Sequence, residues 1–378
     1  MVPAIYQTEE THMQVRAAVF RDGTLNPSFE ELTLAGPRAG EVLVKIVASG
    51  VCHTDLKSAG TVSPVPKPVV LGHEGSGIVE AIGPGVTKVA KGDHVVLTFG
   101  FCGHCPSCTD AEPAYCYNQG KLNFECSPVD GLRYADAKGQ PVHGDFFSQS
   151  SFATYAVGHE RNVVKVRKDA PLELLGPLGC GIQTGAGAIL NDFKLQPGQK
   201  LAVFGVGALG LSAVMAARIA GASRIVAIDR HAHRLALAKD LGADVAIVAG
   251  SEPTSAEVLK QVPGGVDFAL DTTGVLPVMR QAIDSLAPRG MAGFVTSPWD
   301  GSELSVSVRH LLLGRKIRGI IEGNSNPDVF IPMLVDFFMQ GRFPFDRLVQ
   351  FYKFDDIAKA FHDSEDGKTV KPVLRIAA

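Results

Sequence analysis

The pattern of apolar and polar residues changes near the middle of the chain. From residue 14 to about residue 163, short runs such as EVLVKIVASGV and GSGIVEAIG alternate with glycine and proline turns, which is typical of a β-rich domain. From about residue 183, apolar runs such as KLAVFG, RIVAID and VDFALDTTG alternate with helical patterns such as HRLALAKDLG. This alternation predicts a doubly wound parallel sheet, so we expect an α/β protein with two domains.

A further helix is predicted after residue 324. Asn326 and Pro327 suit its cap and first turn, and Gly341 suits its end. Between them, apolar residues recur at helical spacing: Phe330, Met333, Leu334, Phe337 and Phe338. The periodicity predicts the helix but leaves open which domain it joins.

Composition narrows the class of partner. The chain has 378 residues, of which 46% are hydrophobic, and a net charge of −3, so two apolar cores are possible and no basic field attracts nucleic acid or anionic lipid. The first residues lack a basic segment followed by an apolar core, and the uncharged run 201–217 is short for a membrane span. We therefore expect a cytoplasmic protein with a small-molecule partner, bound to neither nucleic acid nor membrane.

The stretch KLAVFGVGALGLSAV predicts a dinucleotide site. Gly205, Gly207 and Gly210 follow a predicted strand and open a helix, and Asp229 ends the next strand. The glycines allow a tight turn, close approach of the backbone to a pyrophosphate, and packing of helix on strand, while the helix N-terminus attracts the anion. Asp229 would bind ribose hydroxyls and favour NAD, although the adjacent Arg230 leaves NADP as an alternative.

Four of the seven cysteines are close in sequence, with the spacing C-x2-C-x2-C-x7-C: Cys102, Cys105, Cys108 and Cys116. Four thiolates at such spacing can surround Zn²⁺ completely, which is typical of a structural site. The odd number of cysteines and the absence of a predicted export signal make disulfides the weaker interpretation, and buried or redox cysteines are the other alternative. His104, inside this loop, is expected at the surface rather than among the ligands.

A second group of possible zinc ligands is dispersed. Cys52 lies in GVCHTD, His73 in LGHEG and Cys180 in GCGIQTGAG. Two thiolates and one imidazole leave a fourth position for water or substrate, which is the composition of a catalytic zinc site. Spacing alone does not separate this hypothesis from the ordinary case of a buried free cysteine.

Taken together, these stretches resemble the zinc-dependent alcohol dehydrogenases of the medium-chain dehydrogenase/reductase family, from about residue 14 to residue 376. The matching motifs are GVCHTD, LGHEGSGIVEAIGPGVTKVAKGDHV, the four-cysteine loop, GCGIQTGAG, GVGALG and GKTVKPVL. The stretches HGDFFSQSSFATYAV, LGPLGCGIQTGAG and DTTGV are most similar to aryl or benzyl alcohol dehydrogenases. The resemblance implies a GroES-like catalytic domain formed by residues 1–182 and 325–378, with a structural zinc lobe at 101–117. A Rossmann domain would then occupy residues 183–324.

The resemblance also implies roles for individual residues at the catalytic zinc. It assigns Cys52, His73 and Cys180 as ligands and places Glu74 beside the metal as an occasional or neighbouring ligand. Asp55 would orient the imidazole of His73, with a turn cap as the alternative role. Two zinc ions per subunit are therefore expected, one catalytic and one structural.

Thr54 matches the hydroxyl that bonds the alcohol and begins removal of its proton. Many relatives carry a histidine three residues later, whereas this chain has Lys57, which is a poor base near neutral pH. The proton would then leave through a cofactor ribose hydroxyl and water. Further contacts with NAD are expected, beyond the glycine motif, from His53, Thr184, Leu209, Arg234, Thr273 and Lys371.

The implied activity is the reversible oxidation of a primary aromatic or allylic alcohol to the aldehyde. Phe146 and Phe147 match pocket positions, with core packing as the alternative, and Thr98 and Trp299 are further candidates for the pocket edge. Other hypotheses are an aliphatic or glutathione-adduct alcohol dehydrogenase and a non-catalytic, zinc-stabilised nucleotide-binding protein. The family further implies a homodimer or homotetramer.

Overall fold

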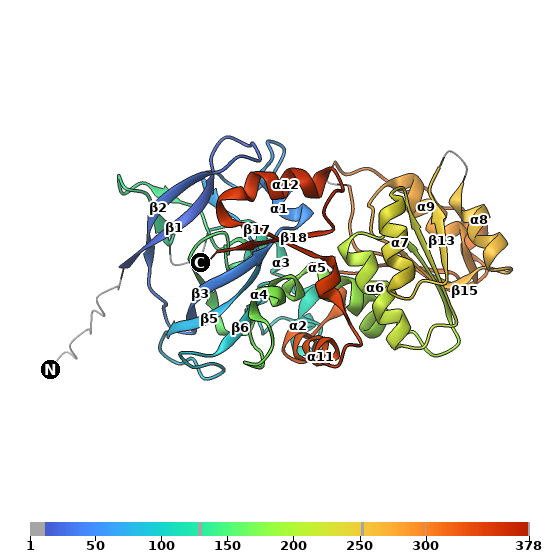
Figure 1. Cartoon of the computed structure of the whole chain (residues 1–378), viewed down its shortest axis with the longest axis horizontal. Helices are drawn as coiled ribbons and strands as arrows, with labels where there is room; N and C mark the ends of the chain where they lie inside the picture. Colours follow the sequence, from blue (N-terminus) through green and yellow to red (C-terminus); the bar gives the residue numbers. More distant parts are fainter. Residues whose placement is uncertain (1–11, 128–130, 251–252, 299, 377–378) are drawn as a thin grey trace.

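The computed structural model describes residues 12–127, 131–250, 253–298 and 300–376. In Figure 1 the β-rich part of the chain lies to the left and the parallel sheet with its helices to the right. Among the described residues no helix is long and apolar enough to cross a membrane.

The β-rich part contains two sheets. The larger has the order β10-β6-β5-β3-β18-β17, with β9 also pairing with β3. Its strands are β3 Glu41–Gly50, β5 Glu74–Ile82, β6 His94–Leu97, β9 Tyr155–His159, β10 Val163–Lys165, β17 Val349–Lys353 and β18 Lys371–Arg375. The smaller sheet, in the order β4-β1-β2-β7-β8, contains β1 His12–Phe20, β2 Ser28–Ala35, β4 Val69–Val70, β7 Tyr134–Ala135 and β8 Pro141–Val142. Because β18 pairs antiparallel with β3, the two ends of the chain build one sheet.

The second part is the predicted parallel sheet, with the order β13-β12-β11-β14-β15-β16. Its strands are β11 Lys200–Phe204, β12 Arg224–Asp229, β13 Val245–Val248, β14 Val266–Asp271, β15 Leu286–Phe294 and β16 Lys316–Gly319. The helices between them are α6 Ala208–Ile219, α7 Ala232–Asp240, α8 Thr254–Gln261, α9 Leu276–Asp284 and α10 Val308–Leu311. The strand order reverses at β11, and a dinucleotide binds across such a reversal, at the carboxyl ends of the strands.

Two segments join the parts. The helices α4 (Leu172–Leu175) and α5 (Gly181–Gly187) lead from the β-rich part into β11, and α5 packs against α6. The predicted helix after residue 324 is α11 (Pro327–Met339), and it packs against β10 and α5. The expected boundary between residues 182 and 183 falls inside α5, so this helix contacts both parts, and the exact domain limits stay a prediction.

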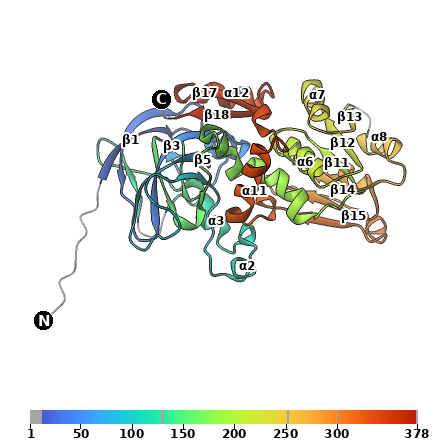
Figure 2. The same cartoon turned by 60° about the horizontal axis from the view of Figure 1, so that its bottom comes forward.

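Four shorter helices complete the β-rich part. They are α1 His53–Ala59, α2 Pro106–Thr109, α3 Gln119–Phe124 and α12 Ile357–Glu365. The segment carrying α2 projects at the bottom of the view in Figure 2. The four clustered cysteines therefore lie on a protruding loop, whereas Cys180, directly before α5, lies at the junction.

Candidate functional site

The glycine turn after β11 has the geometry that a dinucleotide needs. Gly205 has φ 86°, a left-handed conformation that favours glycine. A Cβ on Gly210 would lie 2.0 Å from the carbonyl oxygen of Gly205, so only glycine lets α6 pack this closely. Around Gly207, the N-cap of α6, the nearest atom to an added Cβ is Nη1 of Arg234, at 3.9 Å. The space above the helix N-terminus is thus open for a phosphate.

Asp229 ends β12 beside this turn, and its carboxylate is already held on both oxygens. Oδ2 accepts a hydrogen bond of 2.8 Å from the backbone N–H of Val206. Oδ1 accepts one of 2.8 Å from the backbone N–H of His231 and lies 3.0 Å from Nδ1 of its ring. These contacts fix the acid where ribose hydroxyls would reach it, while the neighbouring Arg230 is exposed. Sequence reasoning did not find His231.

The other expected cofactor contacts lie around the same crevice. Thr184, in α5, is buried and donates its hydroxyl to the carbonyl of Cys180 at 2.8 Å. Leu209 lies in the first turn of α6, where a Cβ on Gly181 would lie 3.3 Å from its side chain. Thr273, after β14, is exposed, and its hydroxyl bonds to Asp271. His53, the first residue of α1, is also exposed.

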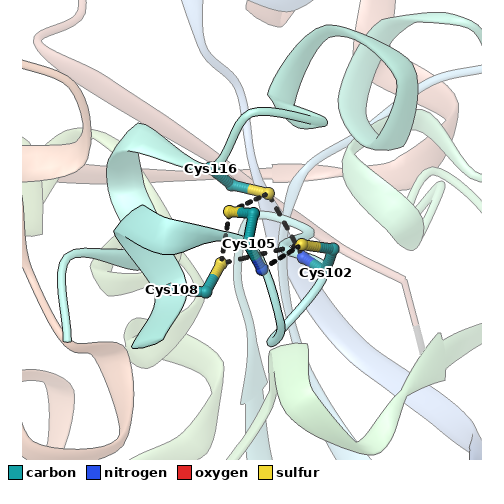
Figure 3. Close-up of side chains that lie close together, drawn as sticks. All are labelled: Cys102, Cys105, Cys108 and Cys116. Carbon is teal, nitrogen blue, oxygen red and sulfur yellow. Dashed lines mark hydrogen bonds between the residues drawn. The ribbon is translucent and has the colours of Figure 1, made fainter. Parts of the chain in front are cut away.

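The four clustered cysteines converge in one loop (Figure 3). Their sulfur atoms lie within 4.8 Å of one another, and that of Cys105 is 3.5 Å from Cys108 and 3.9 Å from Cys116. Backbone N–H groups of the same stretch point at the sulfurs: that of Cys102 lies 3.3 Å from Cys116, and that of Asn118 lies 3.4 Å from the same atom. His104 is not one of the converging residues. The loop therefore offers four sulfur ligands for one metal ion, which suits a structural zinc ion.

The thiols of this loop differ in pKa. Burial opposes ionisation of Cys102, but hydrogen bonds from His104, Asn118 and Cys105 outweigh it and lower the pKa of that thiol to about 5. Burial raises the pKa of Cys108 to about 12. Such a mixture of thiolate and thiol binds zinc with release of the remaining protons.

The dispersed group also converges. Cys52 is the N-cap of α1, His73 and Glu74 lie where the chain enters β5, and Cys180 is the N-cap of α5. Their ligand atoms lie within 4.8 Å of one another although the residues come from three distant segments. A hydrogen bond from Cys180 is the largest effect lowering the pKa of Cys52 well below its usual range. One of the two sulfurs is thereby prepared as a thiolate.

His73 is held in the orientation that a metal ligand needs. Its Nδ1 lies 2.9 Å from Oδ1 of Asp55, which also accepts the backbone N–H of Gly72, while Oδ2 accepts that of Cys52. Burial works against a charge on His73, but the charge and hydrogen bond of Asp55 outweigh it and raise the imidazole pKa well above its usual range. The other ring nitrogen, Nε2, is buried and has no hydrogen-bond partner. A buried unsatisfied nitrogen beside two thiols fits a bound zinc ion.

Gln149 holds the backbone on both sides of Glu74, directly after His73. Its Nε2 donates to the carbonyl of His73 at 2.9 Å and to that of Thr98 at 3.2 Å, and its Oε1 accepts the N–H of Gly75 at 3.2 Å. Gln149 is buried. This contact could not be predicted from the sequence, because the two segments are far apart along the chain.

Glu74 is paired with Lys371 in the interior. The Lys371 ammonium lies 2.9 and 3.0 Å from the two carboxylate oxygens and 3.0 Å from the carbonyl of Val51. Burial opposes the charge on Lys371, but Glu74 outweighs it and raises the lysine pKa. The ammonium expected to meet the cofactor is thus engaged with Glu74, and any contact with a phosphate would compete with that pair.

Aromatic rings cover one side of the dispersed group. The ring of Phe147 stacks on that of His73 with centroids 4.4 Å apart, and the ring of Phe146 meets it edge-on at 5.4 Å. Both phenylalanines are buried, and Phe124 joins them from α3. The hydroxyl of Thr98 is buried and bonds to the carbonyl of Gly179 at 2.7 Å. Trp299 lies outside the described residues.

A buried carboxylate near Cys180 was missed by the sequence reasoning. Glu322, at the start of the short helix η6 (Glu322–Asn324), is 8% exposed and accepts hydrogen bonds from Gln183 and Thr184. Burial is the main cause that raises its pKa to about 7. The available signal was a single acid at the carboxyl end of the apolar run RGIIEGN.

Comparisons with known proteins agree with this geometry. Residues 38–168 match the family described as "Alcohol dehydrogenase GroES-like domain", and residues 208–339 match "Zinc-binding dehydrogenase". Together these matches cover more than half of the chain. The chain therefore belongs to the zinc-dependent alcohol dehydrogenases of the medium-chain dehydrogenase/reductase family. Membership implies NAD as hydride acceptor and both a catalytic and a structural zinc ion, and the four-cysteine loop fits the structural one.

Individual relatives match almost the whole chain. Geraniol dehydrogenase from Castellaniella defragrans is 46% identical over 365 residues, 96% of this chain and 98% of that protein. The structure of benzyl alcohol dehydrogenase from Acinetobacter calcoaceticus has a TM-score of 0.93 and 47% identity, covering 97% of this chain and all of that one. An alcohol dehydrogenase zinc-binding domain protein from Burkholderia ambifaria has a TM-score of 0.95 and 51% identity, with 97% of this chain covered and 100% of that chain. The chain is an alcohol dehydrogenase, and its substrates are small molecules.

Proposed function

We propose that this enzyme oxidises a primary aromatic or allylic alcohol to the aldehyde and transfers the hydride to NAD⁺. The observation that carries the choice of substrate is the phenylalanine pair on His73, with Phe147 stacked at 4.4 Å. Flat rings beside a metal ligand favour a flat, conjugated substrate over a small aliphatic one. The names of the geraniol and benzyl alcohol dehydrogenases similar to this chain support the same choice.

We assign the catalytic zinc to Cys52, His73 and Cys180, with Glu74 as a neighbouring carboxylate. When bound there, zinc supplies Lewis acidity to the alcohol oxygen. Asp55 keeps the imidazole of His73 turned with Nε2 inward, through the contact of 2.9 Å at Nδ1. Lys371 neutralises Glu74, which limits the negative charge around the site.

Thr54 is proposed to take up the proton of the alcohol. It is the second residue of α1, two positions after Cys52, and is half-buried. Its hydroxyl can accept the proton of the substrate while donating its own outward, as a relay requires. The structure leaves Lys57 exposed on the same helix, and the final acceptor is proposed to be a ribose hydroxyl and water.

On the other side of the crevice, the chain binds and orients the cofactor. The turn at Gly207 is proposed to receive the pyrophosphate, and Asp229 the adenosine ribose. Thr184 is proposed to support the nicotinamide ring because its helix, α5, also carries Cys180 at its N-cap. One helix would thus fix the spacing between the zinc site and the hydride acceptor.

The test is NADH formation by the purified, zinc-loaded enzyme with benzyl alcohol, geraniol, ethanol and S-hydroxymethylglutathione supplied separately. We expect the highest kcat/KM with benzyl alcohol or geraniol. Higher kcat/KM with ethanol or the glutathione adduct would contradict the proposed substrate class. Absence of turnover with all four would contradict the proposed reaction.

We also propose a homodimer or homotetramer that assembles through the parallel sheet. The edge strand β16 pairs only with β15 among the described strands, and all four of its residues are exposed. Beside it, Val308, Leu312 and Leu313 are exposed apolar residues. An open edge with apolar neighbours favours pairing with a second copy. Light scattering should show an oligomer that Ile317→Lys dissociates, and a wild-type monomer would contradict this proposal.

A cytoplasmic location stays a prediction.

A further inference from the structure

The segment that carries Phe146 and Phe147 has a strained backbone. It forms the short helix η2 (Phe146–Ser148), and four residues in or beside it have left-handed φ although none is glycine: Asp145 at 57°, Phe147 at 53°, Ser148 at 54° and Ser150 at 58°. Such conformations cost free energy in residues other than glycine, so they persist only where neighbouring groups hold them. The contacts that hold this segment therefore decide where the two rings lie.

Several of these contacts are neutral hydrogen bonds. The backbone N–H of Phe146 donates to the hydroxyl of Ser150 at 2.9 Å, and that hydroxyl donates to the carbonyl of Val70 at 2.7 Å. The hydroxyl of Ser148 donates to the carbonyl of Leu122 at 2.8 Å. These bonds fix the segment from Phe146 onwards, and the residue before Phe146 is held in another way.

That residue, Asp145, belongs to a buried ion pair. Its Oδ1 accepts a hydrogen bond of 3.0 Å from Nε of Arg133, whose side chain is 6% exposed. Its other oxygen, Oδ2, is buried and makes no hydrogen bond to any described residue. The Arg133 guanidinium also binds Glu41, since Nη1 lies 3.0 Å from Oε2 of that carboxylate and Nη2 bonds to Oε1. The rigid fork of Arg133 thus fixes the Asp145 carboxylate relative to Glu41.

The elements that meet at Arg133 show what the pair can do. Arg133 directly precedes β7 of the smaller sheet, and Glu41 is the first residue of β3 in the larger sheet. Arg133 therefore connects both sheets to the start of η2. Without this partner, the left-handed backbone of Asp145 can relax, and rotation there turns the next two residues, Phe146 and Phe147.

We propose that the ion pair of Arg133 and Asp145 positions Phe146 and Phe147 and thereby sets the preference for aromatic or allylic alcohols. Arg133 and Asp145 are positioning residues, because they act through the two rings, and the inference rests on the proposed role of these rings in the substrate pocket. An aromatic wall favours a flat substrate only when its rings lie at the right angle and distance. A rotation of the segment therefore weakens the fit of a flat alcohol more than that of ethanol.

The test measures kcat/KM for benzyl alcohol and for ethanol with the zinc-loaded enzyme. Asp145→Ala removes the pair but leaves Arg133 with its second partner, Glu41, so this variant should fold. We expect the benzyl alcohol/ethanol ratio of kcat/KM to fall by about threefold or more, through a higher KM for benzyl alcohol, with kcat for ethanol within about twofold of the wild type. Asp145→Asn should keep most of the ratio, because its amide oxygen can still accept from Nε of Arg133 and asparagine readily adopts left-handed φ.

Arg133→Met tests the pair from the other side. It removes the guanidinium while keeping an unbranched side chain, and it should lower the ratio in the same direction as Asp145→Ala. If Arg133→Met fails to fold because two buried acids lose their partner, the comparison of Asp145→Ala with Asp145→Asn carries the test.

Glu41→Ala is the matched control. It removes the carboxylate on the opposite side of Arg133 and leaves the contact with Asp145 in place. Its melting temperature should fall, because a buried contact is lost, whereas its benzyl alcohol/ethanol ratio should equal that of the wild type. Glu41→Gln serves the same purpose if Glu41→Ala does not fold.

Three results would overturn the inference: an unchanged ratio in Asp145→Ala, an equal loss of kcat/KM for both alcohols, or an equal change of ratio in the Glu41 control. The last two would indicate a general structural role of the cluster. Phe147→Leu separates the inference from the proposed function. If Phe147→Leu lowers the ratio and Asp145→Ala does not, the positioning role alone is wrong, and if neither lowers it, the proposed pocket is wrong and the inference with it.

Discussion

The two groups of possible zinc ligands both contain cysteines, but the structure positions them differently. In the four-cysteine loop, every sulfur comes from residues 102–116, and backbone N–H groups of residues 102–118 point at the sulfurs. In the dispersed group, the ligands come from three distant segments and are fixed by buried side chains such as Asp55 and Lys371. The first group needs only its own loop, whereas the second needs the whole fold.

This difference explains a division of tasks. Four thiolates leave no coordination position for a substrate, so zinc in the loop contributes stability. Two thiolates and one imidazole leave a position, and the buried junction supplies aromatic rings on one side and the dinucleotide crevice on the other. We expect damage to the loop to appear first in stability, and damage to the dispersed group to appear first in turnover.

The largest expected effect is that of Cys180→Ala. Removal of a ligand at the junction should lower kcat/KM by about a thousandfold or more, because several kcal/mol of charge stabilisation are lost. Zinc content should fall from two ions per subunit towards one, with a melting temperature close to that of the wild type. Cys126→Ala is the control, since Cys126 is buried outside both groups and should leave both ions bound. Full turnover with one zinc ion would contradict the assignment.

Cys102→Ala should have the converse effect. Loss of one of four ligands in a closed site should lower the melting temperature by about 5 °C or more and reduce the yield of zinc-loaded protein. The fraction that stays folded should keep most of its kcat. Calorimetry and metal analysis test this prediction, and an equally stable variant would refute a structural role for the loop.

Asp55→Ala should weaken catalytic zinc by about 10- to 100-fold without affecting the loop. Asp55→Asn should weaken zinc binding less, because the amide oxygen of the asparagine can still accept a hydrogen bond from Nδ1 of His73. Asp93→Ala is a suitable control, since Asp93 accepts the N–H of Ala90 at 3.0 Å and is not one of the residues of either group. If Asp55 acted only as a turn cap, Asp55→Ala would lower stability as Asp93→Ala does. Its affinity for the catalytic zinc would then equal that of the wild type.

The smallest expected effect is on the choice of substrate. Phe147→Leu should lower kcat/KM for benzyl alcohol relative to ethanol by about tenfold or less, because one ring contact is lost while the ligands stay in place. Phe361→Leu, which alters a buried ring stacked on Phe20, should cost stability and leave the substrate ratio unchanged. Equal ratios in the two variants would favour core packing as the role of Phe147.

The contrast between a local and a dispersed group also explains which features could be predicted from the sequence. The four-cysteine loop and the turn Gly205–Gly210 are local, so their spacing alone predicts their geometry, and the alternation of strands and helices predicts the parallel sheet. The group around Cys180 depends on contacts between distant segments, and the sequence suggested it only through resemblance to a family. The structure brings its ligand atoms together, which spacing could not show.

Residues outside any motif were the ones that sequence reasoning missed. Gln149, Glu322 and His231 act through contacts formed only when separate elements pack together. Nothing in a single sequence distinguishes such a residue from any other polar one. The roles of Phe146 and Phe147 stay predictions for a related reason: burial beside His73 is compatible with both a pocket wall and core packing.

The most direct test of the division of tasks is a time course of zinc removal from the wild-type enzyme with dipicolinate. Zinc content, turnover and melting temperature are measured on the same samples. We predict that turnover disappears with the first zinc ion per subunit while the melting temperature is unchanged, and that the melting temperature falls only as the second ion leaves. Loss of stability with the first ion, or turnover that survives its loss, would contradict the account.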